Sequence, residues 1–167
     1  DLQQAVAKVE YVADGVRYTR ECFASYIDQV LVLHLTADQP GKISFTARLT
    51  RGEQRYVDES KPLFHHSLVM KGDGGGGGVQ FCALLSASVV SGSVRTVGES
   101  LEVQNADSVT LYLAAETTFR KPDPESACVE RVRKAAAKSY APIKSDHVED
   151  YTGLYERMQL TLHEDEE

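Results

Sequence analysis

Residues 18–49 read YTRECFASYIDQVLVLHLTADQPGKISFTARL and predict three consecutive β-strands, over 15–23, 29–36 and 42–50. In the third strand, apolar side chains alternate with polar ones, which places one set in a core and the other in water. The break before it contains Pro40 and Gly41, a turn signal because proline fixes φ and glycine permits positive φ. This stretch therefore predicts an antiparallel β scaffold.

Shorter strand patterns surround this stretch. A strand is expected over 5–12, and a turn at 13–15 joins it to the next strand as a hairpin. The polar segment 51–61 is expected to be a loop, with a short strand at 56–57 as the alternative. Further strands are predicted at 63–70, 79–85, 93–97, 101–104 and 109–115. About ten short strands separated by turn residues are typical of a sandwich. We therefore expect a mainly β fold, an antiparallel β-sandwich or super-sandwich.

The pattern changes to helical after Phe119. Asp123 and Pro124 are expected to be the N-cap and first residue of a helix that continues to Tyr140. Pro142 then separates it from a second helix over 143–158. The predicted domains are a sandwich over 1–120, a helical linker packed on it over 121–158, and a short strand with an acidic tail over 159–167.

Composition excludes several classes of partner. The 167 residues carry a net charge of −7, which argues against nucleic-acid binding because phosphate contacts need a basic face. No run of about eighteen apolar residues predicts a membrane span. The chain starts at Asp1 inside a patterned segment, so we expect it to be a piece of a longer polypeptide. No cofactor or metal is predicted.

Three widely spaced cysteines, Cys22, Cys82 and Cys128, include no CxxC pair, so a zinc site is not favoured. Buried free thiols are the favoured interpretation, with a disulfide between Cys22 and Cys82 as the alternative. His65 and His66 are adjacent on a predicted strand and should point to opposite faces, so they cannot form a metal site together. Glu116 ends a buried strand, where burial alone would raise the pKa of its carboxyl.

His147 and Asp150 lie three positions apart on the second predicted helix, so their side chains can touch. Such a pair can serve acid–base catalysis, but it also docks helices onto a sheet or a neighbouring domain. We favour docking, and we include Tyr151 with these two residues as candidate interdomain contacts. No catalytic residue is predicted in this chain.

Four motifs, in order, resemble the amino-terminal β-sandwich domain of the α-L-fucosidases of glycoside hydrolase family 95. They are the stretch 18–41; the strand 107–115; Thr117, Thr118 and Phe119; and the helix residues His147, Asp150, Tyr151, Leu154, Tyr155 and Arg157. The resemblance implies a β-super-sandwich followed by a helical linker and an (α/α)6 barrel. It also implies that the barrel hydrolyses terminal α-1,2-linked L-fucose with inversion, using a glutamate acid and a water oriented by asparagines.

This chain differs from the full enzyme of that family. Asn105 is its sole asparagine, so it cannot supply a catalytic asparagine pair. We therefore expect a non-catalytic module that is inactive alone and whose partners are the barrel of the same polypeptide and, through it, fucosylated glycans. The resemblance alone suggests an extracellular or periplasmic location. The alternative is a stand-alone sandwich for carbohydrate binding or assembly.

Overall fold

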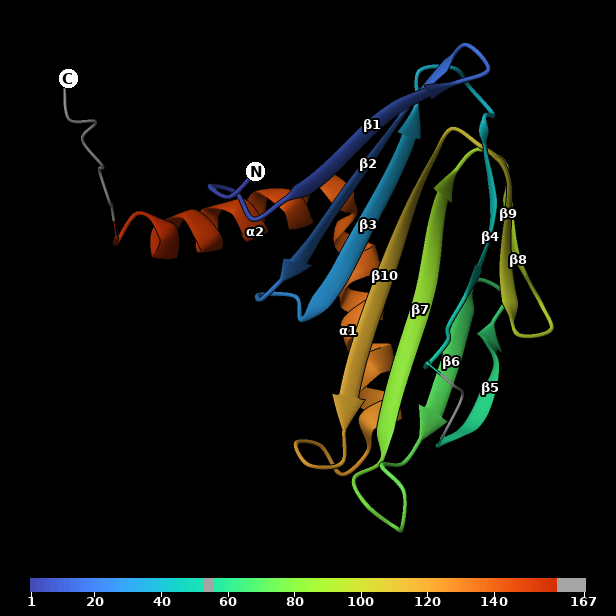
Figure 1. The fold of residues 1–167 in the computed structure, drawn as a ribbon, viewed down its shortest axis with the longest axis vertical. Helices are drawn as coiled ribbons and strands as arrows, with labels where there is room; N and C mark the ends of the chain where they lie inside the picture. Colours follow the sequence, from blue (N-terminus) through green and yellow to red (C-terminus); the bar gives the residue numbers. More distant parts are fainter. Residues whose placement is uncertain (53–55, 159–167) are drawn as a thin grey trace, which may run out of the picture.

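The computed structural model describes residues 1–52 and 56–158, which form two antiparallel sheets followed by two helices (Figure 1). The strands are β1 (Ala7–Ala13), β2 (Val16–Ser25), β3 (Val30–Ala37), β4 (Ile43–Arg48), β5 (Val57–Phe64), β6 (Ser67–Gly72), β7 (Phe81–Val90), β8 (Ser93–Val97), β9 (Ser100–Ala106) and β10 (Ser108–Thr117). The helices are α1 (Pro124–Lys138) and α2 (Tyr140–Tyr155). The predicted mainly β sandwich with a carboxy-terminal helical segment is confirmed.

The larger sheet has seven strands in the order β1-β2-β3-β10-β7-β6-β5, and the smaller has three in the order β4-β9-β8. The smaller sheet covers one face of the larger over β10, β7 and β6, and helix α1 lies against the opposite face (Figure 1). We call these two sides the sandwich face and the helix face. Each has its own apolar core, because successive side chains of a strand point to opposite sides.

Strand β10 is the centre of the molecule, paired with β3 on one side and β7 on the other. Its Tyr112 and Ala114 are buried on the helix face, while Val109 and Leu111 are buried on the sandwich face. Strand β10 is therefore buried on both sides.

Local turn and cap chemistry agrees with the sequence. Asp14 and Gly15 both have positive φ, 51° and 75°, and close the two-residue hairpin between β1 and β2. The Asp123 side chain accepts a hydrogen bond from the Ser126 N–H at 3.0 Å, which caps α1.

Three boundaries differ from prediction. Residues 57–61, expected as part of a loop, belong to β5. The single strand expected over 63–70 is a hairpin of β5 and β6, with His65 and His66 in its turn rather than on opposite faces of a strand. The helices separate at Ser139 and not at Pro142, because Pro142 lies in the first turn of α2, where no intrahelical N–H bond is lost. The strand and tail expected over 159–167 lie outside the described residues.

Candidate interdomain docking site

Helices α1 and α2 meet at a sharp break that we call the elbow, centred on Ser139. Its backbone has φ 63° and ψ 177°, a conformation that strongly favours glycine. A serine remains there only if the contacts on both sides of the break compensate for the strain. The elbow is therefore set by tertiary contacts.

The first of these contacts is a group of five side chains that we call the elbow cluster. Strand register creates half of it, because Glu21 of β2 pairs with His34 of β3, which pairs with Thr110 of β10. These three side chains consequently form one row on the helix face. Tyr140 and Lys144 of α2 complete the cluster.

Hydrogen bonds and ring stacking join the elbow cluster. The Glu21 carboxylate accepts hydrogen bonds from the Tyr140 hydroxyl and from Lys144 Nζ, the latter at 2.8 Å. The Tyr140 ring stacks on the His34 ring with centroids 3.7 Å apart. His34 Nδ1 lies 2.8 Å from Thr110 Oγ1. The start of α2 is thus bound to three neighbouring strands.

The surroundings fix the protonation of the elbow cluster. Burial alone would raise the pKa of Glu21, but hydrogen bonds from Lys144 and Tyr140 lower it below its ordinary value. Burial lowers the pKa of His34, and burial together with Glu21 raises the pKa of Tyr140. At neutral pH the carboxylate is charged while the imidazole and phenol are neutral, which suits docking better than proton transfer.

A second anchor holds the end of α1. Lys138 Nζ lies 2.7 Å from the buried Asp28 carboxylate and 3.1 Å from Asp146 of α2. Asp28 also accepts a hydrogen bond from the Ser25 hydroxyl at 3.0 Å. One ammonium group therefore connects the β2–β3 turn with both helices.

A third anchor lies under the middle of α1, at Glu116 of β10. Its carboxylate accepts hydrogen bonds from Arg131 Nη2 at 2.5 Å and from the Thr117 N–H at 3.0 Å. Burial alone would raise the pKa of Glu116, but these two donors lower it. The expectation from burial alone was therefore wrong, because it left out the arginine on the helix.

Of the three predicted docking residues, His147 is buried against this same module. Its Nε2–H donates to the carbonyl oxygens of Gln4 and Ala5 at 3.0 and 3.3 Å, and its ring stacks on Phe23 with centroids 4.7 Å apart. In the part of the chain that the structure describes, no hydrogen bond or ion pair joins His147 to Asp150. His147 therefore attaches α2 to β2 and to the first turn of the chain.

Asp150 and Tyr151 are half-buried one turn further along α2, where the helix leaves the sandwich. Figure 1 shows α2 extending past β1, away from both sheets. Its last turn and the residues after it expose apolar side chains, with Leu154 54%, Tyr155 44% and Met158 85% exposed. The interdomain role of His147, Asp150 and Tyr151 stays a prediction, and this distal end of α2 is the part available for it.

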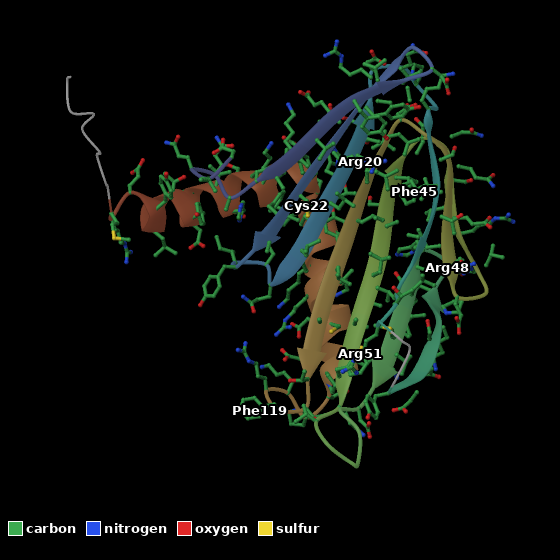
Figure 2. The ribbon with its side chains drawn as sticks, in the orientation of Figure 1. Arg20, Cys22, Phe45, Arg48, Arg51 and Phe119 are labelled. Carbon is green, nitrogen blue, oxygen red and sulfur yellow. The ribbon has the colours of Figure 1, made fainter. Side chains whose placement is uncertain are left out.

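The sandwich face is open over β1, β2 and the beginning of β3, whereas Leu33 and Leu35 of β3 pack against the core beneath the smaller sheet. A groove of about 490 Å³ lies there, bordered by β2, β3 and β4, the edge strand of the smaller sheet. Figure 2 labels Arg20 of β2 and Phe45 of β4, two residues that line this groove. Val9 and Leu31 are exposed apolar residues on this open face.

Sequence reasoning missed the elbow cluster, although part of its signal was present. Tyr140 and Lys144 are four positions apart, a spacing that places two helical side chains on one face. Glu21 and His34 become neighbours only through the register of β2 with β3, which the sequence does not state. No group of three possible metal ligands occurs among residues 1–52 and 56–158, and no helix there is long and apolar enough to cross a membrane.

Three known proteins that are similar to this chain are much longer than it is. A family model described as "Glycosyl hydrolase family 65, N-terminal domain" matches residues 1–122. The "Alpha-L-fucosidase 2" of Arabidopsis thaliana is 31% identical over 97% of this chain and 23% of its own length. The "Probable alpha-fucosidase A" of Aspergillus niger is 23% identical over 97% of this chain and 22% of its own length.

The fold is also found in a solved structure, "Putative kojibiose phosphorylase from human microbiome". It superposes with a TM-score of 0.62 at 9% identity, over 93% of this chain and 24% of that one. This chain thus spans about a quarter of the length of the proteins it matches. The expected resemblance to amino-terminal domains of α-L-fucosidases is confirmed, although the family model carries the number 65 and not 95.

Proposed function

Because this chain belongs to the glycosyl hydrolase family 65 N-terminal domain family, we propose that it is the non-catalytic amino-terminal module of an α-L-fucosidase. The two fucosidase-named relatives, both about four times longer, support this proposal. In it, a helical barrel elsewhere in the same polypeptide releases terminal α-1,2-linked L-fucose from glycans with inversion. The protein would act outside the cell or in a periplasm.

The observation that carries the proposal is the contrast between the two ends of α2. Its first half is bound by the elbow cluster and by His147, so its direction relative to the sheets is fixed. Its distal end exposes Leu154, Tyr155 and Met158, which are apolar groups that a neighbouring domain would cover. A rigid helix with an apolar free end suits a linker that orients a second domain.

The ionisable groups of the module support a non-catalytic role. Inverting glycoside hydrolysis needs a carboxylic acid and a second group that activates water, with room for that water between them. Here the half-buried carboxylate of Glu21 and the buried carboxylate of Glu116 each accept a hydrogen bond from a cation, and both have lowered pKa values. A carboxylate in that state is a poor proton donor at neutral pH.

The open sandwich face also favours a module over a stand-alone protein. An unpaired strand edge beside apolar side chains invites association when it is exposed. We propose that other parts of the longer polypeptide cover the groove between β4 and the open strands.

The test compares the 167-residue chain with the longer polypeptide that contains it, using release of fucose from a 2′-fucosylated oligosaccharide. We expect turnover from the longer protein and none from the chain alone. Turnover by the chain alone at the rate of the longer protein would overturn the proposal. In the longer protein, His147→Ala should lower the melting temperature more than the turnover of the protein that remains folded.

A carbohydrate-binding sandwich remains the second hypothesis. Tyr11 and Tyr18 stack on each other in the groove, with centroids 5.1 Å apart, and Arg20 lies over the Tyr11 ring. The stack uses one face of each tyrosine ring, which reduces the aromatic surface left for a sugar. Calorimetric titration of the chain with fucosylated oligosaccharides distinguishes the non-catalytic module from the carbohydrate-binding sandwich. Saturable binding would favour the carbohydrate-binding sandwich.

A further inference from the structure

Two cysteine thiols meet in the core between the larger sheet and helix α1. Cys82 on β7 is 1% exposed and Cys128 on α1 is 0% exposed. The Cys128 thiol donates a hydrogen bond to the Cys82 carbonyl oxygen at 3.6 Å. The two residues are 46 positions apart, so this contact joins separate parts of the fold.

Strand register explains why these two cysteines meet and the third does not. Cys82 shares the helix face with Leu84, and Cys128 lies at the base of α1, directly against it. Cys22 pairs with Leu33 on the sandwich face, on the other side of the sheet. The disulfide between Cys22 and Cys82 considered from sequence is therefore excluded by geometry.

We propose that Cys82 and Cys128 form a disulfide when the protein folds in the presence of a disulfide oxidant of the glutathione class, covalently fixing α1 to β7. One oxidised glutathione is consumed per bond. One of the two cysteine thiolates attacks a glutathione sulfur and releases one glutathione, and the other then attacks the mixed disulfide and releases the second. The two protein thiols lose two protons and two electrons, and the two released glutathione molecules gain them.

Packing of the two thiols limits when these steps can occur. In the folded state, the contact with Cys82 and burial raise the pKa of the Cys128 thiol, so it is protonated there. Since both groups are buried in the folded state, the reaction must occur before α1 packs or during its transient opening.

The disulfide would stabilise the position of α1, the helix that precedes α2. It would close a loop from β7 to α1, which removes conformational freedom from the unfolded chain. It would also hold the base of the helix that leads into the elbow. This inference stands on the two thiols alone and is independent of the proposed catalytic partner.

The experiment refolds the reduced, unfolded 167-residue chain in an oxidising glutathione buffer. We expect a mass loss of two hydrogens, one free thiol per chain on titration in denaturant, and a linked peptide pair containing Cys82 and Cys128. Three free thiols, or a linked pair containing Cys22, would overturn the proposal.

Variants provide the matched controls. Cys22→Ser should still lose two hydrogens and should retain no free thiol, while Cys128→Ser should lose none. The oxidised wild type should melt roughly 5 °C above its reduced form, and this shift should persist in Cys22→Ser. Equal melting temperatures of the two forms would exclude a stabilising bond. The peptide map of the wild type decides the connectivity even if Cys128→Ser fails to fold.

Discussion

The two faces of the seven-stranded sheet are formed by the same strands but differ in how completely other elements of the chain cover them. On the helix face, α1 covers the apolar row of β10 and β7, and the carboxylates of Glu116 and Glu21 are paired with cations from the helices. On the sandwich face, the smaller sheet leaves β1, β2 and the beginning of β3 uncovered, with Val9 and Leu31 exposed. Within the described residues, the helices therefore cover the helix face, whereas part of the sandwich face is open.

The largest effect should follow from removing Arg131, the partner of the buried Glu116. Arg131→Ala leaves a buried carboxylate without its cation, which typically costs about 3 kcal/mol of unfolding free energy. Urea unfolding of the wild type and the variant measures this difference at neutral pH.

Lys134 supplies the control on the same helix. It pairs with Glu130 at 2.6 Å, but both side chains are mostly exposed. Lys134→Ala should leave the urea midpoint unchanged, because exposed ion pairs are screened by water. If Arg131→Ala and Lys134→Ala lowered the urea midpoint equally, the Glu116–Arg131 pair would stabilise the fold no more than an exposed ion pair does.

A smaller effect is expected at Glu21, which can be compared with a glutamate of the neighbouring strand. Glu10 of β1 also contacts a lysine and a hydroxyl, namely Lys8 Nζ at 3.1 Å and Thr19 Oγ1 at 3.4 Å, but in solvent. Glu21→Gln should cost about 1.5 kcal/mol, since it weakens two charge-assisted hydrogen bonds that dock α2.

Glu10→Gln should leave stability unchanged in the same urea titration. The near-ultraviolet signal of the tyrosines adds a second readout. Weakening the hydrogen bond of the Tyr140 hydroxyl should alter this signal in Glu21→Gln but not in Glu10→Gln. An equal loss in both variants would mean that the elbow cluster contributes no more than a surface pair.

The features that sequence could predict are those encoded within a few residues. Alternation over 42–50 indicates β4, Asp14 and Gly15 indicate the first hairpin, and Asp123 indicates the start of α1. Each of these depends on side-chain period, turn chemistry or capping, which act locally.

The features that sequence did not predict depend on neighbours far along the chain. The β5–β6 hairpin turns at His65 and His66, which carry no glycine or asparagine signal. The break at Ser139 requires a strained φ that only the packed helices justify. The pKa of Glu116 is lowered by the Thr117 N–H and by Arg131, which lies fifteen residues later and reaches the carboxylate across the helix face. A local sequence pattern does not identify a contact partner that only tertiary packing places nearby.

The smallest effect expected is a pH dependence at His34, which tests whether the helix face is dry beneath the elbow. Burial lowers the pKa of His34 from 6.5, Lys144 lowers it further, and Glu21 opposes them. The folded state therefore binds fewer protons than the unfolded state just below pH 6.5. This contribution to stability is fully present above pH 6.5 and falls as the pH decreases, by at most about 1.4 kcal/mol per pH unit.

Urea unfolding between pH 7.5 and about 5 measures this slope. His34→Gln can retain a hydrogen bond to Thr110 but cannot take up a proton, so its curve should be flatter over this range. Glu21 and Glu116 also have lowered pKa values, and their contribution is lost only at lower pH, as each carboxylate takes up a proton. Identical slopes for the wild type and His34→Gln would mean that His34 titrates as it would in water, and that the cluster beneath the elbow is open to solvent.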